Sequence, residues 1–196
     1  MHKKNNNKKI ILITGVSGGL GSALFKLLIK EDFHIIGVAK NAGALESLKN
    51  SILATPNCSF DLISIDLKEK NSVKDLSEEI FIRWGQLDIL VHCAAISGPM
   101  SPSNVIFEPN FKKVFFNNVF STKYIISFMD PLLRASSDSK AIFVDDEMTR
   151  KFTSTYSSSK AATRDMAICY QMENERIGPK VHLFNPKPMK TNIRKK

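Results

Sequence analysis

The stretch that most limits the possible folds of this chain is a glycine-rich segment between an apolar run and an amphipathic one. It reads Ile10-Ile-Leu-Ile-Thr-Gly-Val-Ser-Gly-Gly-Leu-Gly21 and continues into residues 22–30. The four apolar residues 10–13 predict a strand buried on both faces. The glycines that follow predict a tight turn. The next apolar residues recur at helical spacing, at Leu20, Leu24, Leu27 and Leu28.

A strand, a glycine turn and a helix N-terminus together form an anion site. The first backbone N–H groups of a helix have no partner within the helix, and the positive end of its dipole points at the turn. Glycine also lets a pyrophosphate approach the main chain where a Cβ would collide. The alternative at this point is a glycine-rich connection that binds nothing.

The rest of the chain alternates strand-length apolar runs with helix-length segments, which predicts right-handed βαβ units and a parallel sheet. The length of 196 residues favours one domain, which we place at residues 10–196 after a basic tail at residues 1–9. We expect strands at 33–39, 60–66, 87–95, 141–144 and 181–184. Helices are expected around 45–52, 68–80, 111–134 and 156–175, with loops at 97–110 and 145–155.

The net charge of +9 is concentrated at the two ends of the chain. Residues 1–9 and 187–196 hold nine basic residues and no acid, and the 19 basic residues between them face 19 acidic ones. Basic ends of this kind are usually solvated, so we expect neither a nucleic-acid partner nor a membrane partner. The basic residues of the ends are Lys3, Lys4, Lys8, Lys9, Lys187, Lys190, Arg194, Lys195 and Lys196.

The cysteines and histidines predict neither disulfides nor a metal site. Cys58, Cys93 and Cys169 are widely spaced and odd in number, and the four histidines lack ligand spacing. The N-terminal segment lacks the apolar length of a secretory signal, and no apolar run approaches the ~20 residues of a membrane span. We therefore expect a cytoplasmic protein.

A second group of residues, Tyr156-Ser-Ser-Ser-Lys160, begins the last long predicted helix. Residues four apart share one helical face, and an ammonium group beside a phenol favours the phenolate. Such a tyrosine can donate or accept a proton near neutral pH. The spacing alone is also common by chance on solvated helices.

The order of these features resembles the short-chain dehydrogenase/reductase family over roughly residues 10–194. It consists of Thr14-Gly-x-x-x-Gly-x-Gly21, then Asp66, then Asn118, then Tyr156 with Lys160. The resemblance implies a Rossmann-type, doubly wound α/β fold of about six parallel strands with helices on both faces. Residues 130–135, 142–144 and 185–191 look closest to bacterial oxoacyl-carrier-protein-reductase-like members.

The resemblance also implies a dinucleotide site. Gly15, Gly19 and Gly21 would hold the pyrophosphate, with Thr14 fixing the turn, and Asp66 would accept a hydrogen bond from the adenine amino group beside Leu67. Lys40 follows Ala39 where NAD-preferring members carry an acid, which favours NADP(H) over NAD(H); the alternative is a solvated lysine. The remaining residues expected at this site are Ser17, Leu20, Ala94, Pro186 and Thr191, together with Tyr156 and Lys160.

By the same resemblance, Tyr156 would protonate a substrate carbonyl as hydride arrives, making the chain a carbonyl or alcohol oxidoreductase. Lys160 would bind the nicotinamide ribose, and Asn118 would hold a water that resupplies protons. Asn117 is the alternative residue for this role. The alternative interpretation of Asn118 is a core asparagine. Family members pair the helices at 111–134 and 156–175 across subunits, which implies a homodimer or homotetramer.

Several positions depart from the family pattern. His92-Cys-Ala-Ala95 replaces Asn-Asn-Ala-Gly, and Asp145-Asp146 stand where a serine would polarise the carbonyl. An ionised carboxylate cannot donate to an oxyanion; Thr153, Ser154 or Thr155 would have to replace that serine. Lys187 replaces a glycine, and family members continue beyond the position of residue 196 into a substrate-covering helix and a further strand. The alternative function is therefore a degenerate member that binds dinucleotide or partner subunits with little turnover.

Overall fold

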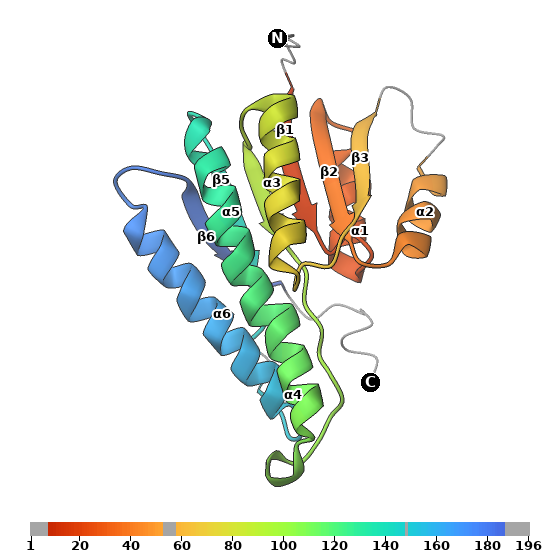
Figure 1. Cartoon of the computed structure of the whole chain (residues 1–196), viewed down its shortest axis with the longest axis vertical. Helices are drawn as coiled ribbons and strands as arrows, with labels where there is room; N and C mark the ends of the chain where they lie inside the picture. Colours follow the sequence, from red (N-terminus) through yellow and green to blue (C-terminus); the bar gives the residue numbers. More distant parts are fainter. Residues whose placement is uncertain (1–7, 53–57, 148, 187–196) are drawn as a thin grey trace.

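The computed structural model describes residues 8–52, 58–147 and 149–186, and it confirms the doubly wound α/β fold (Figure 1). Six parallel strands lie in the order β3-β2-β1-β4-β5-β6. The strands are β1 (Lys9–Thr14), β2 (Phe33–Ala39), β3 (Ser59–Ser64), β4 (Ile89–His92), β5 (Lys140–Val144) and β6 (Lys180–Phe184). The α-helices are α1 (Gly19–Leu28), α2 (Ala42–Asn50), α3 (Lys70–Trp84), α4 (Glu108–Phe115), α5 (Ser121–Ala135) and α6 (Ser154–Glu173).

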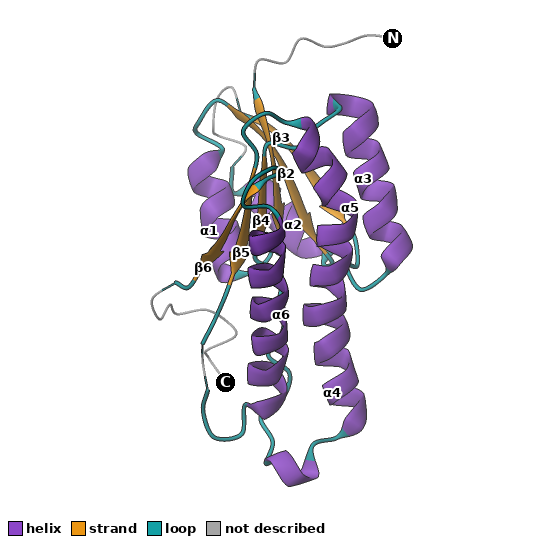
Figure 2. Ribbon diagram, turned by 90° about the vertical axis from the view of Figure 1, so that its left-hand side faces the viewer, coloured by secondary structure: helices purple, strands orange, loops and turns teal. Residues whose placement is uncertain are grey.

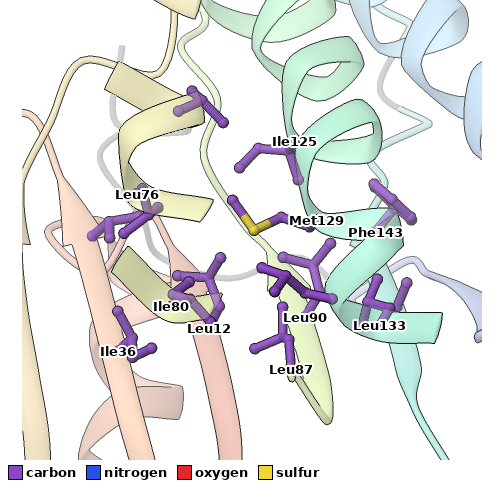
Figure 3. Packing of buried hydrophobic residues seen from close by; sticks show 14 of the residues in the cluster. Leu12, Ile36, Leu76, Ile80, Leu87, Leu90, Ile125, Met129, Leu133 and Phe143 are labelled. Atoms are coloured by element: carbon purple, nitrogen blue, oxygen red, sulfur yellow. The ribbon is translucent and has the colours of Figure 1, made fainter. Parts of the chain in front are cut away.

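The two faces of the sheet carry separate apolar cores because side chains alternate along each strand. In β1, Ile11 and Ile13 pack with α1 and α2, whereas Ile10 and Leu12 pack with α3, α5 and α6. Figure 3 shows Leu12 in this second core, which contains residues of α3, α5 and the strands. The labelled members are Leu12, Ile36, Leu76, Ile80, Leu87, Leu90, Ile125, Met129, Leu133 and Phe143. All of them are at most 4% exposed.

Helix α4 and much of α6 extend beyond the carboxyl ends of the strands, whereas α5 lies alongside the sheet (Figure 2). Figure 2 shows α6 beside the continuous column of α4 and α5. The loop from β4 to α4, which includes the short 3₁₀ helix η1 (Ser103–Val105), closes the far end. The part of the molecule that faces the ends of β4 and β5 is therefore helical.

The predicted helix at 111–134 differs from the structure in its start and in its middle. It begins at Glu108 with a proline in the first turn, a position where proline costs no hydrogen bond. A π-helical turn, η2 (Phe116–Phe120), then joins α4 to α5. Because π turns often occur at functional sites, this interruption draws attention to Asn117 and Asn118.

Two smaller expectations are also corrected. The apolar face of α1 does not include Leu27, which is 60% exposed; Phe25 is fully buried instead. Strand β3 ends at Ser64, so Asp66 lies in the loop after it. Among the described residues, no helix is both long and apolar enough to cross a membrane.

Candidate functional site

A cavity of about 360 Å³ lies at the carboxyl ends of the strands, next to the neighbouring strands β1 and β4, whose following connections lead to helices on opposite faces of the sheet. Ligands of open α/β sheets bind at such a switch point. Residues that directly follow five of the strands line it. The lining residues are Gly15, Ser17, Gly18, Gly19, Leu20, Gly21, Ala39, Lys40, Ile65, Asp66, Leu67, Cys93, Ala94, Ala95, Ile96, Asn117, Val144, Asp145, Asp146, Tyr156, Lys160 and Pro186.

The glycine turn leaves no room for side chains at two positions. Gly15 has a φ of +73°, and a Cβ there would lie 2.8 Å from the Cα of Ala94. A Cβ on Gly21 would collide with the carbonyl oxygen of Gly15 and lie 3.1 Å from the Cα of Val16. The turn therefore requires glycine for its own shape, whatever it binds.

The N-terminus of α1 is open toward the cavity. Its N-cap is Gly18, which supplies no side-chain cap, and its first turn contains no acid. Free N–H groups and the positive end of the helix dipole therefore lie at the cavity wall, next to Gly19 and Leu20. This arrangement suits a phosphate group.

Lys40 and Asp66 form an ion pair at one end of the cavity, with 2.6 Å between Nζ and Oδ2. The Lys40 side chain is 67% exposed and that of Asp66 is 20% exposed. Burial raises the pKa of Asp66, but hydrogen bonds from Lys40 and the backbone of Lys68 outweigh that effect and hold the pKa below its usual value. Asp66 is therefore ionised at neutral pH, and Lys40 is held beside it.

Tyr156 and Lys160 lie together at the other end. Both are buried on α6, and the Lys160 ammonium donates to the carbonyl oxygen of Val144 at 2.7 Å. The Tyr156 hydroxyl donates to Oδ2 of Asp146 at 3.2 Å. Burial lowers the pKa of Lys160, while the charges of Asp145 and Asp146 act in the opposite direction.

Arg164 extends this face of α6 by one more turn. Its Nε donates to Oδ2 of Asp145 at 2.5 Å, and Asp145 is 5% exposed. Positions 156, 160 and 164 are each four residues apart, so all three side chains face the end of β5. Asp145 is thus held by Arg164, whereas the neighbouring Asp146 faces Tyr156.

Asn118 lies in the π turn and is 1% exposed. Its Oδ1 accepts from the N–H of Ile96, and its Nδ2 donates both to the carbonyl of Ile96 and to Oγ of Ser159. It lines a small cavity of about 10 Å³ next to Lys160, about the size of one water. Asn117 lines the large cavity instead and donates to the carbonyl of Lys113.

Thr14 and His92 join the ends of β1 and β4. The Thr14 hydroxyl oxygen accepts from the N–H groups of Cys93 and Ala94, at 3.1 and 3.2 Å, and lies 2.8 Å from Nδ1 of His92. Its two acceptor positions are used, so its hydrogen must point to Nδ1. The other ring nitrogen of His92 is 3.0 Å from Oγ1 of Thr122.

This arrangement fixes the tautomer of His92. Burial, with a smaller effect from the charge of Lys160, lowers the pKa of His92 to about 3, so the ring is neutral. Nδ1 accepts from Thr14, and Nε2–H donates to Thr122, whose hydroxyl donates in turn to the carbonyl of Asn118 at 2.6 Å. A directed chain of hydrogen bonds thus connects the glycine turn with the π turn.

The structure brings most of the predicted site residues to one cavity: Gly15, Ser17, Gly19, Leu20, Gly21, Lys40, Asp66, Leu67, Ala94, Tyr156, Lys160 and Pro186 line it. Thr14 and Asn118 lie behind the wall, in the hydrogen-bonded layer described above. Thr191 and Lys187 lie outside the described residues.

Two of the candidate replacements for the missing serine, Thr153 and Ser154, bond with residues other than Tyr156. The Thr153 hydroxyl bonds with Arg150 and Ser157, and Ser154 bonds with Ser103. Thr155 is buried in the first turn of α6. The side chain that contacts the Tyr156 hydroxyl is instead that of Asp146.

Sequence reasoning did not assign roles to Arg164, Thr122 or Ser159. The position of Arg164 was a usable signal, because it lies on the helical face of Tyr156 and Lys160. Thr122 and Ser159 gave none, because their partners lie 30 and 41 residues away.

A model of the short chain dehydrogenase family matches residues 9–196, so the chain belongs to this family. Short-chain dehydrogenase anuI of Penicillium roqueforti is 31% identical over 130 residues, which cover 66% of this chain and 51% of that protein. Benzil reductase ((S)-benzoin forming) IRC24 of Saccharomyces cerevisiae is 32% identical over 173 residues, with coverage of 82% and 64%. The chain thus spans about half to two thirds of the length of these relatives.

Solved structures agree with this family fold. An alcohol dehydrogenase of Thermococcus sibiricus, solved with 5-hydroxy-NADP, has a TM-score of 0.80 at 20% identity. The match covers 91% of this chain and 75% of that one. At this identity the likeness concerns the fold.

Proposed function

We propose that the protein is an NADP(H)-dependent oxidoreductase that reduces a carbonyl group or oxidises a secondary alcohol. The observation that carries the proposal is the pairing, in one cavity, of a glycine cradle at a helix N-terminus with buried Tyr156 and Lys160. A cradle without a proton donor would suit a binding protein. A tyrosine and a lysine at the opposite end of the same cavity add the group that general acid catalysis needs.

The residues present fit a dinucleotide. The open N-terminus of α1 and the close-packed Gly15 and Gly21 suit a pyrophosphate, and Asp66 with Leu67 suits an adenine. Lys160 would hold the nicotinamide ribose. When bound, the dinucleotide supplies or accepts the hydride, and this chain's own residues orient the substrate and supply the proton through Tyr156.

Lys40 supports a preference for NADP(H). An ammonium group beside the ribose 2′ position attracts a phosphate there, and the Thermococcus relative was solved with a 5-hydroxy-NADP. The ion pair with Asp66 modifies the expectation, because Asp66 competes with a 2′-phosphate for the same ammonium. We therefore expect only a moderate preference for NADP(H) over NAD(H).

The proposal includes a cytoplasmic homodimer or homotetramer formed through α4, α5 and α6. Exposed aromatic side chains on this helical column support a contact surface: Phe107, Phe116 and Phe120 are 65, 43 and 42% exposed. The closer likeness to oxoacyl-carrier-protein reductases remains a prediction. Thr191 also stays a predicted cofactor contact.

Titration of the purified protein with NADPH and NADH, followed by calorimetry, tests the proposal first. We expect tighter binding of NADPH, and turnover of a carbonyl panel that falls at least about a hundredfold in Tyr156→Phe. Binding without turnover, unchanged by Tyr156→Phe, would favour the degenerate member instead. Failure to bind either dinucleotide would reject both.

A further inference from the structure

Asp146 is a carboxylate at the point where the reacting group of a substrate would lie. It directly follows Asp145 at the end of β5, lines the large cavity and accepts a hydrogen bond from the Tyr156 hydroxyl. The reactive end of the cavity therefore presents an acceptor next to its proton donor.

The charged side chains that line the same cavity, or lie next to it, each have a contact of their own. Arg164 holds Asp145, Lys40 holds Asp66 at the far end, and the Lys160 ammonium is bound to the carbonyl of Val144. Burial lowers the pKa of Lys160, and the charges of Asp145 and Asp146 act in the opposite direction. Asp146 is the carboxylate that contacts the Tyr156 hydroxyl at this end of the cavity.

A carboxylate discriminates between two kinds of reducible double bond. Reduction of a ketone places negative charge on oxygen, and a carboxylate beside that oxygen repels it and has no hydrogen to donate. A protonated imine instead carries its positive charge and an N–H group before reduction, and both are satisfied by a carboxylate. From this geometry we infer that the site binds a protonated carbon–nitrogen double bond, or the corresponding ammonium product, in preference to a ketone of the same shape.

The inference rests on the proposed dinucleotide-dependent hydride transfer and narrows its substrate class. In the step, a C–H bond forms at the iminium carbon with a hydride from a reduced nicotinamide dinucleotide, which is oxidised. The π electrons of the C=N bond become the nitrogen lone pair, leaving a neutral amine. That amine then takes a proton from solvent or from Tyr156.

The test uses a matched pair of bicyclic compounds. 3,4-Dihydroisoquinoline, kept protonated in slightly acidic buffer, is compared with 1-tetralone as a substrate. Independently of turnover, calorimetry measures how 1,2,3,4-tetrahydroisoquinolinium and 1-tetralol bind to the protein saturated with oxidised dinucleotide. The variants are Asp146→Asn, Asp146→Ser and, as a control that removes a charge one residue further on, the exposed Glu147→Gln.

We expect the ammonium compound to bind at least about tenfold more tightly than the alcohol, and this preference to disappear in Asp146→Asn and Asp146→Ser but persist in Glu147→Gln. We also expect Asp146→Ser to shift turnover toward the ketone. Unfolding midpoints establish that each variant is folded.

Equal or better binding of the alcohol by the unaltered protein would overturn the inference. An equal loss of ammonium binding in Glu147→Gln would also overturn it, because the effect would then be one of general charge. Ketone reduction without ammonium binding would leave the proposed function standing and reject the inference alone. Dinucleotide binding with ammonium preference but no turnover would support the inference and reject the proposed activity.

Discussion

The two ends of the cavity are built by different means. At the pyrophosphate end, the shape depends on missing side chains, since Cβ atoms on Gly15 and Gly21 would strike backbone atoms. At the reactive end, the shape depends on polar side chains that hold one another: Asn118 with Ser159, and Asp145 with Arg164. A substitution at a close-packed glycine causes a collision at once, whereas a substitution in the hydrogen-bonded group removes individual bonds.

The largest effect is expected from Gly21→Ala. The added methyl group would collide with the Gly15 carbonyl, so we expect loss of about 3 kcal/mol of unfolding free energy and at least about a hundredfold weaker dinucleotide binding. Urea unfolding and calorimetry measure the two effects. Gly43→Ala in α2 is the control, because a Cβ there would meet only Asn41 Oδ1, at 3.4 Å. An equal effect of both substitutions would contradict the steric account.

Asn118→Ala and Asn117→Ala compare neighbouring positions at the reactive end. Asn118 makes three buried or partly buried hydrogen bonds, so we expect a loss of about 2–3 kcal/mol in unfolding free energy. Asn117 donates one exposed bond, and its loss should cost under about 1 kcal/mol. If the two variants unfold at the same urea concentration, Asn118 contributes no more to stability than Asn117, which would contradict this prediction.

His92 makes the reactive end sensitive to acid. Well above pH 6.5 the ring is neutral in both folded and unfolded chains, but as pH falls toward 3 the unfolded chain binds a proton that the folded chain, with its pKa lowered to about 3, does not. Stability should therefore fall with pH, by about 2 kcal/mol at pH 5. His92→Asn should flatten this slope in urea unfolding at several pH values. His34, whose pKa burial also lowers, is present in both proteins and so cancels.

The smallest effect is expected at Lys40. Lys40→Ala should weaken NADPH binding by about fivefold and NADH binding by less, because the ammonium is largely exposed and already shared with Asp66. Calorimetry with both dinucleotides measures the difference. Equal weakening of NADPH and NADH binding would indicate that Lys40 only holds Asp66 in place and does not contact a 2′-phosphate.

Sequence reasoning succeeded where a feature is local. The alternation of strands and helices, and hence the sheet, could be predicted because each element buries a periodic apolar face. The glycine turn could be predicted because strand, turn and helix are contiguous. The π turn could not, because nothing in residues 116–120 distinguishes it from α-helix without the partners of Asn118.

The reactive end was harder to predict because its partners are distant in sequence. Thr14 and His92 are 78 residues apart, and only the register of β1 beside β4 brings them together. His92 was noted as a departure from the family, but its partners Thr14 and Thr122 could not be named. Asp145 and Asp146 were predicted together to stand at the serine position, but the contact of Asp146 with Tyr156 required the three-dimensional structure.

The hydrogen-bond chain from Thr14 through His92 and Thr122 to Asn118 has one further consequence. Every link has its single hydrogen pointing the same way, and the chain ends on a carbonyl that offers no hydrogen to pass on. To carry a proton, every link would have to turn in concert, and the ring would have to accept a second hydrogen in a setting that disfavours its charge. The chain therefore holds the glycine turn and the π turn in fixed positions relative to each other without conducting protons between them.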